Sequence, residues 1–375
     1  MKIAVNTIFL QQHRLEGYGY FVQEIFKRLA VKFPEHEFIF LFDRDYDEQF
    51  IFSSNVKPFV IKPKARHALA FKFWYDVKLA WVLRSVKPNV VVQPYGFCSL
   101  TIKFPQLLVV HDLAFLHYPQ FISKQHLFYY KRYTPKFLQK AKRVATVSQF
   151  SKQDIINQYK IPSEKIDVVY SAAKPVFKTE AYVIQSAIKE KYADGCEYFL
   201  FTGGIHPRKN LLNLLKAFSI FKKWQQSNMK LLVVGRIAWQ TDDLLDKLET
   251  YKYRDDVALL GYVEENELAN ITASAYALIF PSYFEGFGVP PLEAMQCNVP
   301  VITSNVSSMP EICGNAAVYA NPDDYEEIAE KMKLLYRDET FRNEMINNGK
   351  VQCKKFSWDN TADLLWQSIL KTTNN

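Results

Sequence analysis

The sequence predicts an α/β protein made of two doubly wound domains in series. Short apolar runs rich in β-branched and aromatic residues alternate with helix-like segments, the pattern of a parallel sheet covered on both faces. The alternation breaks between Ser171 and Gly195 and then restarts. A chain of 375 residues has room for two ordinary domains. We therefore expect an N-terminal domain, a C-terminal domain and a final helix over residues 1–172, 173–357 and 358–375.

The individual elements follow from the same alternation. In the first domain the expected strands are residues 2–9, 37–42, 89–93, 106–110, 144–147 and 166–170. Its expected helices are residues 20–33, after a loop over 11–19, and 152–159, preceded by the capping residue Ser148. In the second domain the expected strands are residues 198–202, 231–234, 257–260, 277–280, 300–303 and 316–319. Helices are expected over residues 211–224, 264–275, 325–336, 341–356 and 358–371, with another beginning at Pro290.

Composition narrows the class of protein. Apolar residues make up 49% and charged residues 23%, as in soluble globular chains. No apolar run approaches the length of a membrane-spanning helix, and Met1-Lys2 leads straight into a strand-like run, so we expect no signal peptide and a cytoplasmic protein. The cysteines are odd in number and widely spaced, as expected of reduced packing thiols: Cys98, Cys196, Cys297, Cys313 and Cys353.

The net charge of +8 is concentrated in two stretches of the first domain. Residues Lys57–Lys87 contain eight Lys and Arg and a single acid, Asp76, while Lys124–Arg143 contain seven and no acid. Aromatic residues interleave with both stretches. Two interpretations remain open: a face that contacts an anionic membrane, or a solvated helix face with a buried aromatic side. No nucleic-acid-binding module is visible, so no nucleic-acid partner is expected.

The stretch from Phe280 to Asp323 is the richest in candidate chemistry. Glu285 and Glu293 lie eight positions apart around a glycine turn, Glu285 in the loop after a strand and Glu293 in the following helix. Open α/β sheets hold ligands at the carboxyl ends of their strands. Two carboxylates beside free backbone N–H groups at such a place suggest a hydroxyl-rich ligand, such as a nucleotide sugar.

The expected cationic partners of such a ligand are Arg208 and Lys209. They follow the strand 198–202 in a loop that starts with Gly203 and Gly204. A diphosphate requires positive charge, most of all as a leaving group, and these donors would supply it without a metal. The alternative, two exposed cations at a helix start, is disfavoured by the helix dipole.

Three other motifs in the first domain are weaker signals. His111 ends a strand, where it would touch substrate with Asp112 bracing or charge-tuning it, or would be a satisfied histidine in a turn. Gly17 and Gly19 precede a helix, either as a phosphate-binding loop or as a plain turn. The acidic run Asp43–Asp47 contains two DxD triplets, which we interpret as a solvated loop, so no metal site is expected.

The motifs together resemble one enzyme family. EGFGVPPLEAM, the run TSNVSSMPEICGNAA after it and GGIHPRKNL before it are similar to the signature of retaining glycosyltransferases of family 4, the group 1 glycosyltransferases. The similarity is strongest over residues 198–358 and continues more weakly through the first domain. It implies the GT-B architecture: two Rossmann-like domains facing a central cleft, and a C-terminal helix that returns to the first domain.

The resemblance also implies residue roles. Arg208 and Lys209 would hold the donor diphosphate, Glu293 the ribose, and Glu285 and His111 the transferred sugar. The catalytic set would be His111, Arg208, Lys209 and Glu285. Donor-binding residues would further include Gly19, Gly204, Tyr262, Val263, Gly286, Phe287, Gly288 and Val289. The family retains the anomeric configuration, generally without a metal.

The implied activity is transfer of a hexose from a UDP- or GDP-linked sugar, with no cofactor. The acceptor would be a glycan or lipid-linked glycan of a cell-surface polysaccharide. Two alternatives stay open: a GT-B epimerase acting on the nucleotide sugar, and a non-catalytic nucleotide-sugar-binding subunit. One departure concerns Gly204, which stands where many family members have an arginine.

Overall fold

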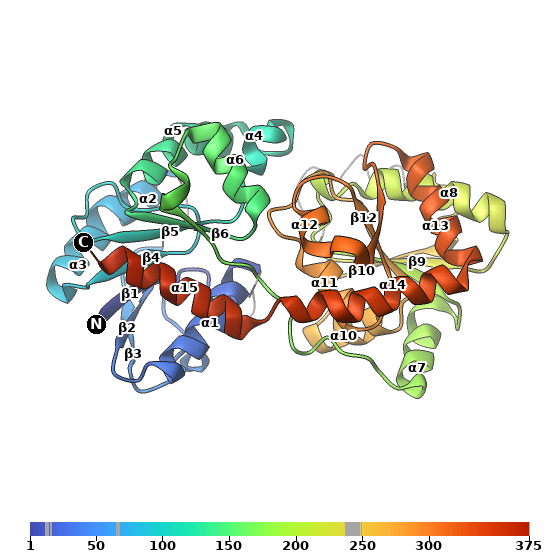
Figure 1. Cartoon of the computed structure of the whole chain (residues 1–375), viewed down its shortest axis with the longest axis horizontal. Helices are drawn as coiled ribbons and strands as arrows, with labels where there is room; N and C mark the ends of the chain where they lie inside the picture. The colour runs from blue at the N-terminus through green and yellow to red at the C-terminus, as the bar shows by residue number, and fades with distance from the viewer. Residues whose placement is uncertain (12–14, 16, 65–67, 237–247, 249, 375) are drawn as a thin grey trace. The chain divides into compact units, whose positions relative to one another are not determined.

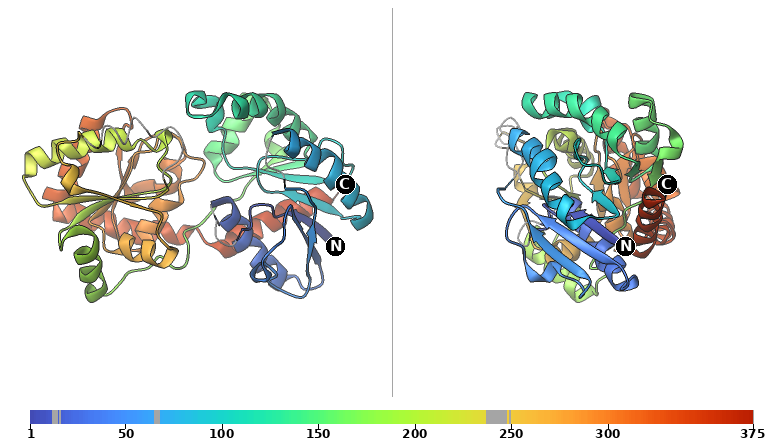
Figure 2. Two further views of the ribbon diagram at one scale, coloured as in Figure 1. Left: turned by 180° about the vertical axis from the view of Figure 1, so that it is seen from behind. Right: turned by 90° about the vertical axis from the view of Figure 1, so that its left-hand side faces the viewer.

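The computed structural model describes residues 1–375 except 12–14, 16, 65–67, 237–247, 249 and 375. The chain forms two compact units (Figure 1). Unit 1 comprises Met1–Ser171 and Ser357–Asn375, and unit 2 comprises Ala172–Phe356. Helices cover both faces of a sheet in each unit (Figure 2), so the predicted α/β class is confirmed.

Unit 1 contains a seven-stranded parallel sheet in the order β3-β2-β1-β4-β5-β6-β7. Its strands are β1 Lys2–Asn6, β2 Glu37–Phe42, β3 Val56–Val60, β4 Val90–Gln93, β5 Gln106–Val110, β6 Arg143–Thr146 and β7 Ile166–Val168. Its helices are α1 Gly17–Lys32, α2 Ala68–Phe73, α3 Leu79–Val86, α4 Ala114–His117, α5 Lys124–Lys140, α6 Gln149–Tyr159 and α15 Trp358–Thr373. The strand order reverses at β1, with β2 on one side and β4 on the other.

Strand β3 was not predicted from the sequence. It pairs in parallel with β2, placing Pro58 opposite Phe40, and it is the edge strand of the sheet. A proline lacks the N–H that an inner strand needs, so it fits at an edge. The expectation of a basic region without a strand is therefore wrong over these residues.

Unit 2 contains a six-stranded sheet in the order β10-β9-β8-β11-β12-β13. Its strands are β8 Tyr198–Thr202, β9 Lys230–Val234, β10 Val257–Gly261, β11 Ala277–Phe280, β12 Val301–Ser304 and β13 Ala317–Ala320. Its helices are α7 Tyr182–Ala193, α8 Leu211–Gln225, α10 Glu265–Ala273, α11 Val289–Gln296, α12 Met309–Cys313, α13 Tyr325–Arg337 and α14 Glu339–Gln352. The order reverses at β8, so the loops after β8 and β11 leave the sheet side by side.

Helix α15, at the red end of the chain in Figure 1, packs on α1 within unit 1. Trp366 stacks on Phe33 with ring centroids 4.1 Å apart. Ion pairs join Arg28 to Asp359 at 2.7 Å and Lys32 to Asp363 at 2.5 Å. The last helix of the sequence therefore completes the first unit.

Among the described residues, no helix combines the length and the apolar character needed to cross a bilayer.

We predict that Trp366→Ala destabilises unit 1 by about 3–5 kcal/mol, because it removes a large buried aromatic side chain. Trp366 is 5% exposed, whereas Trp224 in unit 2 is 44% exposed, so Trp224→Ala is the matched control. Native-state hydrogen exchange on peptides from the strands of unit 1 measures the change. Equal protection in the two variants would contradict the packing role of α15.

Candidate active site

The candidate site is built on the loops that follow β8 and β11, the central strands of unit 2. Asn210, in the loop after β8, connects the two loops. Its buried amide donates to the carbonyl oxygen of Pro281 after β11 at 3.0 Å and to that of Pro322 after β13 at 2.7 Å. The N–H of Tyr283 donates to the carbonyl of Arg208 at 3.0 Å. The order of strands in the sheet therefore brings together segments that are about 70 residues apart in the sequence.

Three predicted residues meet between these loops. Lys209 Nζ lies 2.5 Å from Glu285 Oε1, and Arg208 Nη1 lies 3.5 Å from Glu285 Oε2. Arg208 also donates to the carbonyl of Phe284. Glu285 is buried. The structure thus places the expected sugar-binding carboxylate directly on the expected diphosphate-binding cations.

The ion pairs decide the protonation state of Glu285. Burial favours the neutral acid, but the charges of Lys209 and Arg208 and the hydrogen bond from Lys209 outweigh it, so the pKa of Glu285 is lowered. The carboxylate is ionised at neutral pH and neutralises one of the two cations. The three side chains together carry a net charge of +1 and are largely shielded from water.

The glycine turn after Glu285 is fixed by its packing. Gly288 has φ 88°, a backbone conformation that L side chains rarely adopt, so this position favours glycine. Ser308 Oγ donates to the carbonyls of Glu285 and Phe287, both at 3.0 Å. The N–H of Glu285 donates to Ser307 Oγ at 3.1 Å. The turn that carries Gly286 and leads into Val289, the first residue of α11, is thus held in one conformation.

Glu293 lies in α11, apart from the cluster of Arg208, Lys209 and Glu285. It is buried near Lys174 and Glu265. Burial raises its pKa to about 7; Glu265 adds to the rise, while the charge of Lys174 and a hydrogen bond from the Lys174 backbone oppose it. Burial is therefore the main influence on the Glu293 carboxyl, and it favours the neutral acid.

The loop after β10 carries the residues predicted beside the nucleotide base. Tyr262 is 56% exposed and follows Gly261, whose φ is 65°. The guanidinium of Arg236 lies over the Tyr262 ring, 4.4 Å from its centroid; Val263 follows in the same loop. Sequence reasoning gave Arg236 no role, although a basic residue directly after a strand-closing glycine was a usable signal.

Gly204 lies in open space. A Cβ built on it would meet nothing within 4 Å. Packing therefore does not require glycine at this position. Many proteins of the family that the sequence resembles have an arginine here.

His111 lies in unit 1, at the end of β5. Its Nε2 is 3.0 Å from the carbonyl of Pro94, and its ring contacts Tyr18 and Phe21 with centroids 4.6 and 5.1 Å apart. Burial lowers its pKa, only partly opposed by the Pro94 hydrogen bond and the charge of Asp112, so the imidazole is neutral at pH 7. The Asp112 carboxylate accepts from the N–H of Ala114 at 2.9 Å, and its negative charge raises the His111 pKa, so of the two expected roles the structure supports charge-tuning.

Gly19 lies inside helix α1, which begins at Gly17. The expected helix start at Tyr20 is therefore wrong, and the expected loop 11–19 lies partly outside the described residues. A Cβ on Gly19 would lie 2.6 Å from the carbonyl oxygen of Phe9. Close packing of the helix on the preceding segment is thus a sufficient reason for this glycine.

Two carboxylates of the acidic run in unit 1 are paired with cations. Asp43 contacts Arg44 at 2.7 Å, and Asp45 contacts Lys62 at 3.0 Å. In the part of the chain that the structure describes, no group of three or more His, Cys, Asp or Glu side chains is arranged to hold a metal.

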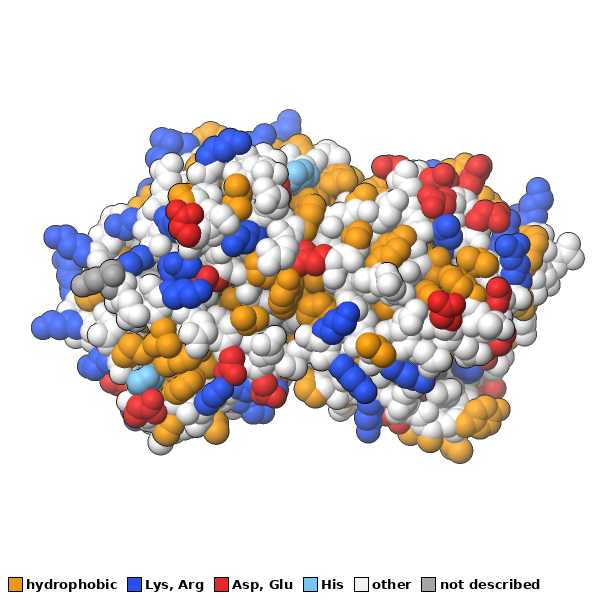
Figure 3. Space-filling view, in the orientation of Figure 1, with side chains coloured by type: hydrophobic (Ala, Val, Ile, Leu, Met, Phe, Trp, Pro, Cys, Tyr) orange, Lys and Arg blue, Asp and Glu red, His pale blue; other side chains and the backbone are white. Residues whose placement is uncertain are grey.

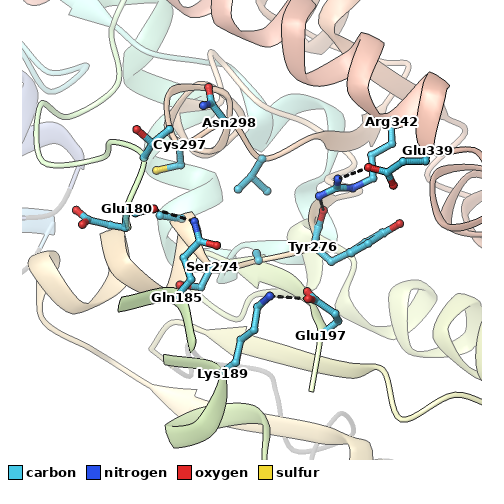
Figure 4. Close-up of a pocket in the computed structure, with 14 residues that line it drawn as sticks. Glu180, Gln185, Lys189, Glu197, Ser274, Tyr276, Cys297, Asn298, Glu339 and Arg342 are labelled. Atoms are coloured by element: carbon cyan, nitrogen blue, oxygen red, sulfur yellow. Dashed lines mark hydrogen bonds and ion pairs between the residues drawn. The ribbon is translucent and has the colours of Figure 1, made fainter. Parts of the chain in front are cut away.

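A separate pocket of about 520 Å³ lies at the opposite ends of the unit 2 strands, where β8 and β11 begin (Figure 4). Two ion pairs line it, Lys189 with Glu197 at 2.5 Å and Arg342 with Glu339 at 3.3 Å. It contains none of the predicted site residues. The cluster of Arg208, Lys209 and Glu285 at the carboxyl ends of β8 and β11 is the candidate site because it brings predicted residues together.

We predict that Glu293→Gln stabilises unit 2 increasingly as the pH rises. The pKa of Glu293 is raised from 4.5 to about 7 on folding, so its contribution is fully favourable below pH 4.5 and is lost as the pH rises through about 7. Glutamine stays neutral, and the difference grows to roughly 3 kcal/mol at about 1.4 kcal/mol per pKa unit. Hydrogen exchange of unit 2 peptides between pH 4.5 and 7.5 measures it, after correction for intrinsic exchange rates. Glu330→Gln, an exposed carboxylate, is the control, and parallel pH profiles for wild type and Glu293→Gln would contradict the assignment.

Comparison with known proteins identifies the family. The family model described as "Glycosyl transferases group 1" matches residues 185–352, and the one described as "Glycosyltransferase Family 4" matches residues 17–174. The O-antigen chain mannosyltransferase B of Escherichia coli is 30% identical over 292 residues, covering 78% of this chain and 76% of that protein. The O-antigen chain mannosyltransferase RfbU of Salmonella typhimurium is 35% identical over 220 residues, covering 58% of this chain and 57% of that protein.

Solved structures agree on the fold. The crystal structure of Anabaena Alr3699/HepE in complex with UDP and glucose matches with a TM-score of 0.77, at 16% identity and 99% coverage of both chains. At this identity the likeness shows the fold alone, and it confirms the predicted GT-B fold. The family matches in both halves of the chain and the relative that covers most of it agree: the protein belongs to the group 1 glycosyltransferases.

Proposed function

We propose that the protein is a retaining, metal-independent hexosyltransferase, with mannose as the transferred sugar, and that its donor is a GDP- or UDP-linked sugar. The observation that carries the proposal is the cluster of Arg208, Lys209 and Glu285 at the carboxyl ends of β8 and β11. Mannose is favoured because two relatives that align with much of the chain are named as mannosyltransferases.

The cluster suits a donor diphosphate in its charge and its shielding. Arg208 and Lys209 would hold the phosphate oxygens and neutralise the charge that grows on the diphosphate as it leaves. Hydrogen bonds of this kind, to charged groups, contribute about 1.5–3 kcal/mol each. Because Glu285 pairs with both cations, a diphosphate bound to the same cations would compete with it. The released carboxylate would then accept hydrogen bonds from hydroxyls of the transferred sugar.

The other assignments are proposals of the same kind. Glu293 would bind the ribose, and donor binding would favour its ionised form if both ribose hydroxyls donate to it. Tyr262 and Val263 would flank the base, and the turn from Gly286 to Val289 would let the sugar approach the backbone. Gly19 would do the same for the phosphates, although its packing provides a structural reason for it. His111, neutral at pH 7, suits a hydrogen bond to a sugar hydroxyl.

The chemistry follows from retention of configuration. The acceptor hydroxyl would attack the anomeric carbon on the face from which the diphosphate departs, forming one C–O bond as the other breaks. The leaving phosphate oxygen would take the acceptor's proton, so that no protein base is required. The cations would stabilise the leaving group, which is the role that a divalent metal has in other transferases.

The acceptor we propose is a glycan or lipid-linked glycan of a cell-surface polysaccharide, with the enzyme in the cytoplasm at the inner face of the cell membrane. The names of the relatives, which refer to O-antigen chains, support this acceptor class. They also favour transfer over the two alternatives, epimerisation and binding without catalysis. Product analysis without acceptor separates the enzymes, since an epimerase converts its donor alone.

We predict that Lys209→Met lowers transfer by about 10- to 100-fold, since it removes one charged hydrogen bond to the leaving group. Lys216→Met, which removes an exposed lysine of α8, is the matched control and should keep wild-type activity. The assay is transfer from GDP-mannose and a panel of UDP-sugars to a glycan acceptor, with the anomer of the product read by NMR and with EDTA present throughout. An inverted product, loss of activity in EDTA or full activity of Lys209→Met would each contradict the part of the proposal that it tests.

A further inference from the structure

The two basic stretches that the sequence analysis singled out, Lys57–Lys87 and Lys124–Arg143, meet in unit 1. Phe97 contacts both stretches: its ring centroid lies 5.7 Å from that of Phe71 in α2 and 5.9 Å from that of Tyr130 in α5. Lys72 lies over the Tyr133 ring at 5.1 Å. Helices α2 and α5, which are far apart in the sequence, therefore belong to one surface.

The single acid of the first stretch is turned inward. Asp76 Oδ2 pairs with Lys72 at 2.7 Å, while Oδ1 accepts from the N–H of Leu100 at 2.7 Å and from Ser99 Oγ at 3.3 Å. Its side chain is only 11% exposed. The outer face of these helices consequently presents positive charge without a compensating acid from either stretch.

Apolar side chains stand out from the same helices. Phe73, Val77 and Trp81 are 48%, 50% and 70% exposed and follow one another at four-residue spacing through α2, the π-helical turn Trp74–Lys78 and α3. A spacing of about one turn places them near one face. The opposite face supplies the core, where Trp74 is buried and donates from Nε1 to the carbonyl of Ile61 at 2.9 Å. Packing in the core therefore does not explain why Phe73, Val77 and Trp81 are apolar.

Cations flank this row and continue onto α5. Lys78 lies over the Phe73 ring at 6.0 Å, and Arg84 is exposed on α3. On α5, Phe128 is 72% exposed, and Lys131 and Arg132 are exposed nearby. Lys and Arg side chains also gather along the edge of unit 1 over α3 and α5 (Figure 3). We call the exposed side chains of Phe73, Val77, Trp81, Phe128 and the flanking Lys and Arg residues the basic aromatic surface.

We propose that the basic aromatic surface binds an anionic lipid bilayer. Exposed aromatic side chains insert at the level of lipid headgroups, and Lys and Arg beside them are attracted to anionic lipids. The aliphatic Val77 in the row favours lipid over nucleic acid, which would use the aromatic faces for stacking. The proposal rests on the proposed function only for its purpose, which is to keep the enzyme at a lipid-linked acceptor.

The test is co-sedimentation of the full chain with vesicles at low salt. We expect binding to phosphatidylglycerol–phosphatidylcholine vesicles at least about tenfold stronger than to phosphatidylcholine alone, and weaker at high salt. The double variant Phe73→Ser, Trp81→Ser should lower binding to the anionic vesicles by about tenfold or more, since it removes the apolar anchors. Trp224→Ser, at an exposed tryptophan of unit 2, should bind like the wild type.

Three outcomes would overturn the proposal: no sedimentation of the wild type, equal losses in the double variant and the control, or binding to single-stranded DNA as strong as to vesicles and equally sensitive to the double variant. Circular dichroism spectra and melting temperatures show that each variant is folded. Transfer to a water-soluble acceptor should be unchanged in the double variant, which keeps this test separate from that of the proposed function. Lys209→Met should do the reverse, losing transfer while keeping vesicle binding.

Discussion

The ion cluster of Lys209, Arg208 and Glu285 depends on two loops being held side by side, and the fold of unit 2 provides this. A buried carboxylate between two cations is stable only where geometry and hydrogen bonds compensate its desolvation. Because β8 and β11 are neighbouring strands, the loops that carry Lys209 and Glu285 lie close together. The side-chain amide of Asn210 connects these loops by its hydrogen bonds. The glycine turn and the serines of the following segment complete the support. The order of strands in the sheet therefore determines which residues meet at the site.

The cluster also indicates how two cations can lie side by side in a shielded site. Two unpaired cations within a shielded site would repel each other and resist burial. Glu285 offsets that repulsion, because its carboxylate places a negative charge between the two cations. The same carboxylate then has a second use, since a sugar bound to the diphosphate brings hydroxyl groups that it can accept from. One residue would serve both the resting and the occupied site.

The sequence predicted most of the fold and the three residues that meet in the ion cluster, but not the contacts between them. Strands such as β2, β5, β8 and β11 were located to the residue because fully buried parallel strands are continuous apolar runs. Strand β3 was missed because an edge position tolerates Pro58 and exposed charges, which look like a loop. Helix α1 was started late because glycines usually signal a turn, whereas Gly19 is there to permit close packing.

The contacts within the site could not be predicted from the sequence either. Glu285 and its cations were all identified, but their ion pairs join positions 76 residues apart, a contact set by strand order. The raised pKa of Glu293 depends on its burial near Lys174 and Glu265, which no local pattern encodes. The inward turn of Asp76 likewise required the loop at Ser99 and Leu100.

The most direct test of the account is calorimetric titration of wild type and Glu285→Gln with a nucleoside diphosphate that lacks the sugar, GDP or UDP. If Glu285 and the diphosphate share the same cations, removing its charge frees Lys209 and Arg208, and the diphosphate should bind about tenfold more tightly, which corresponds to about 1.4 kcal/mol. Unchanged or weaker binding by Glu285→Gln would contradict the placement of the diphosphate on this cluster.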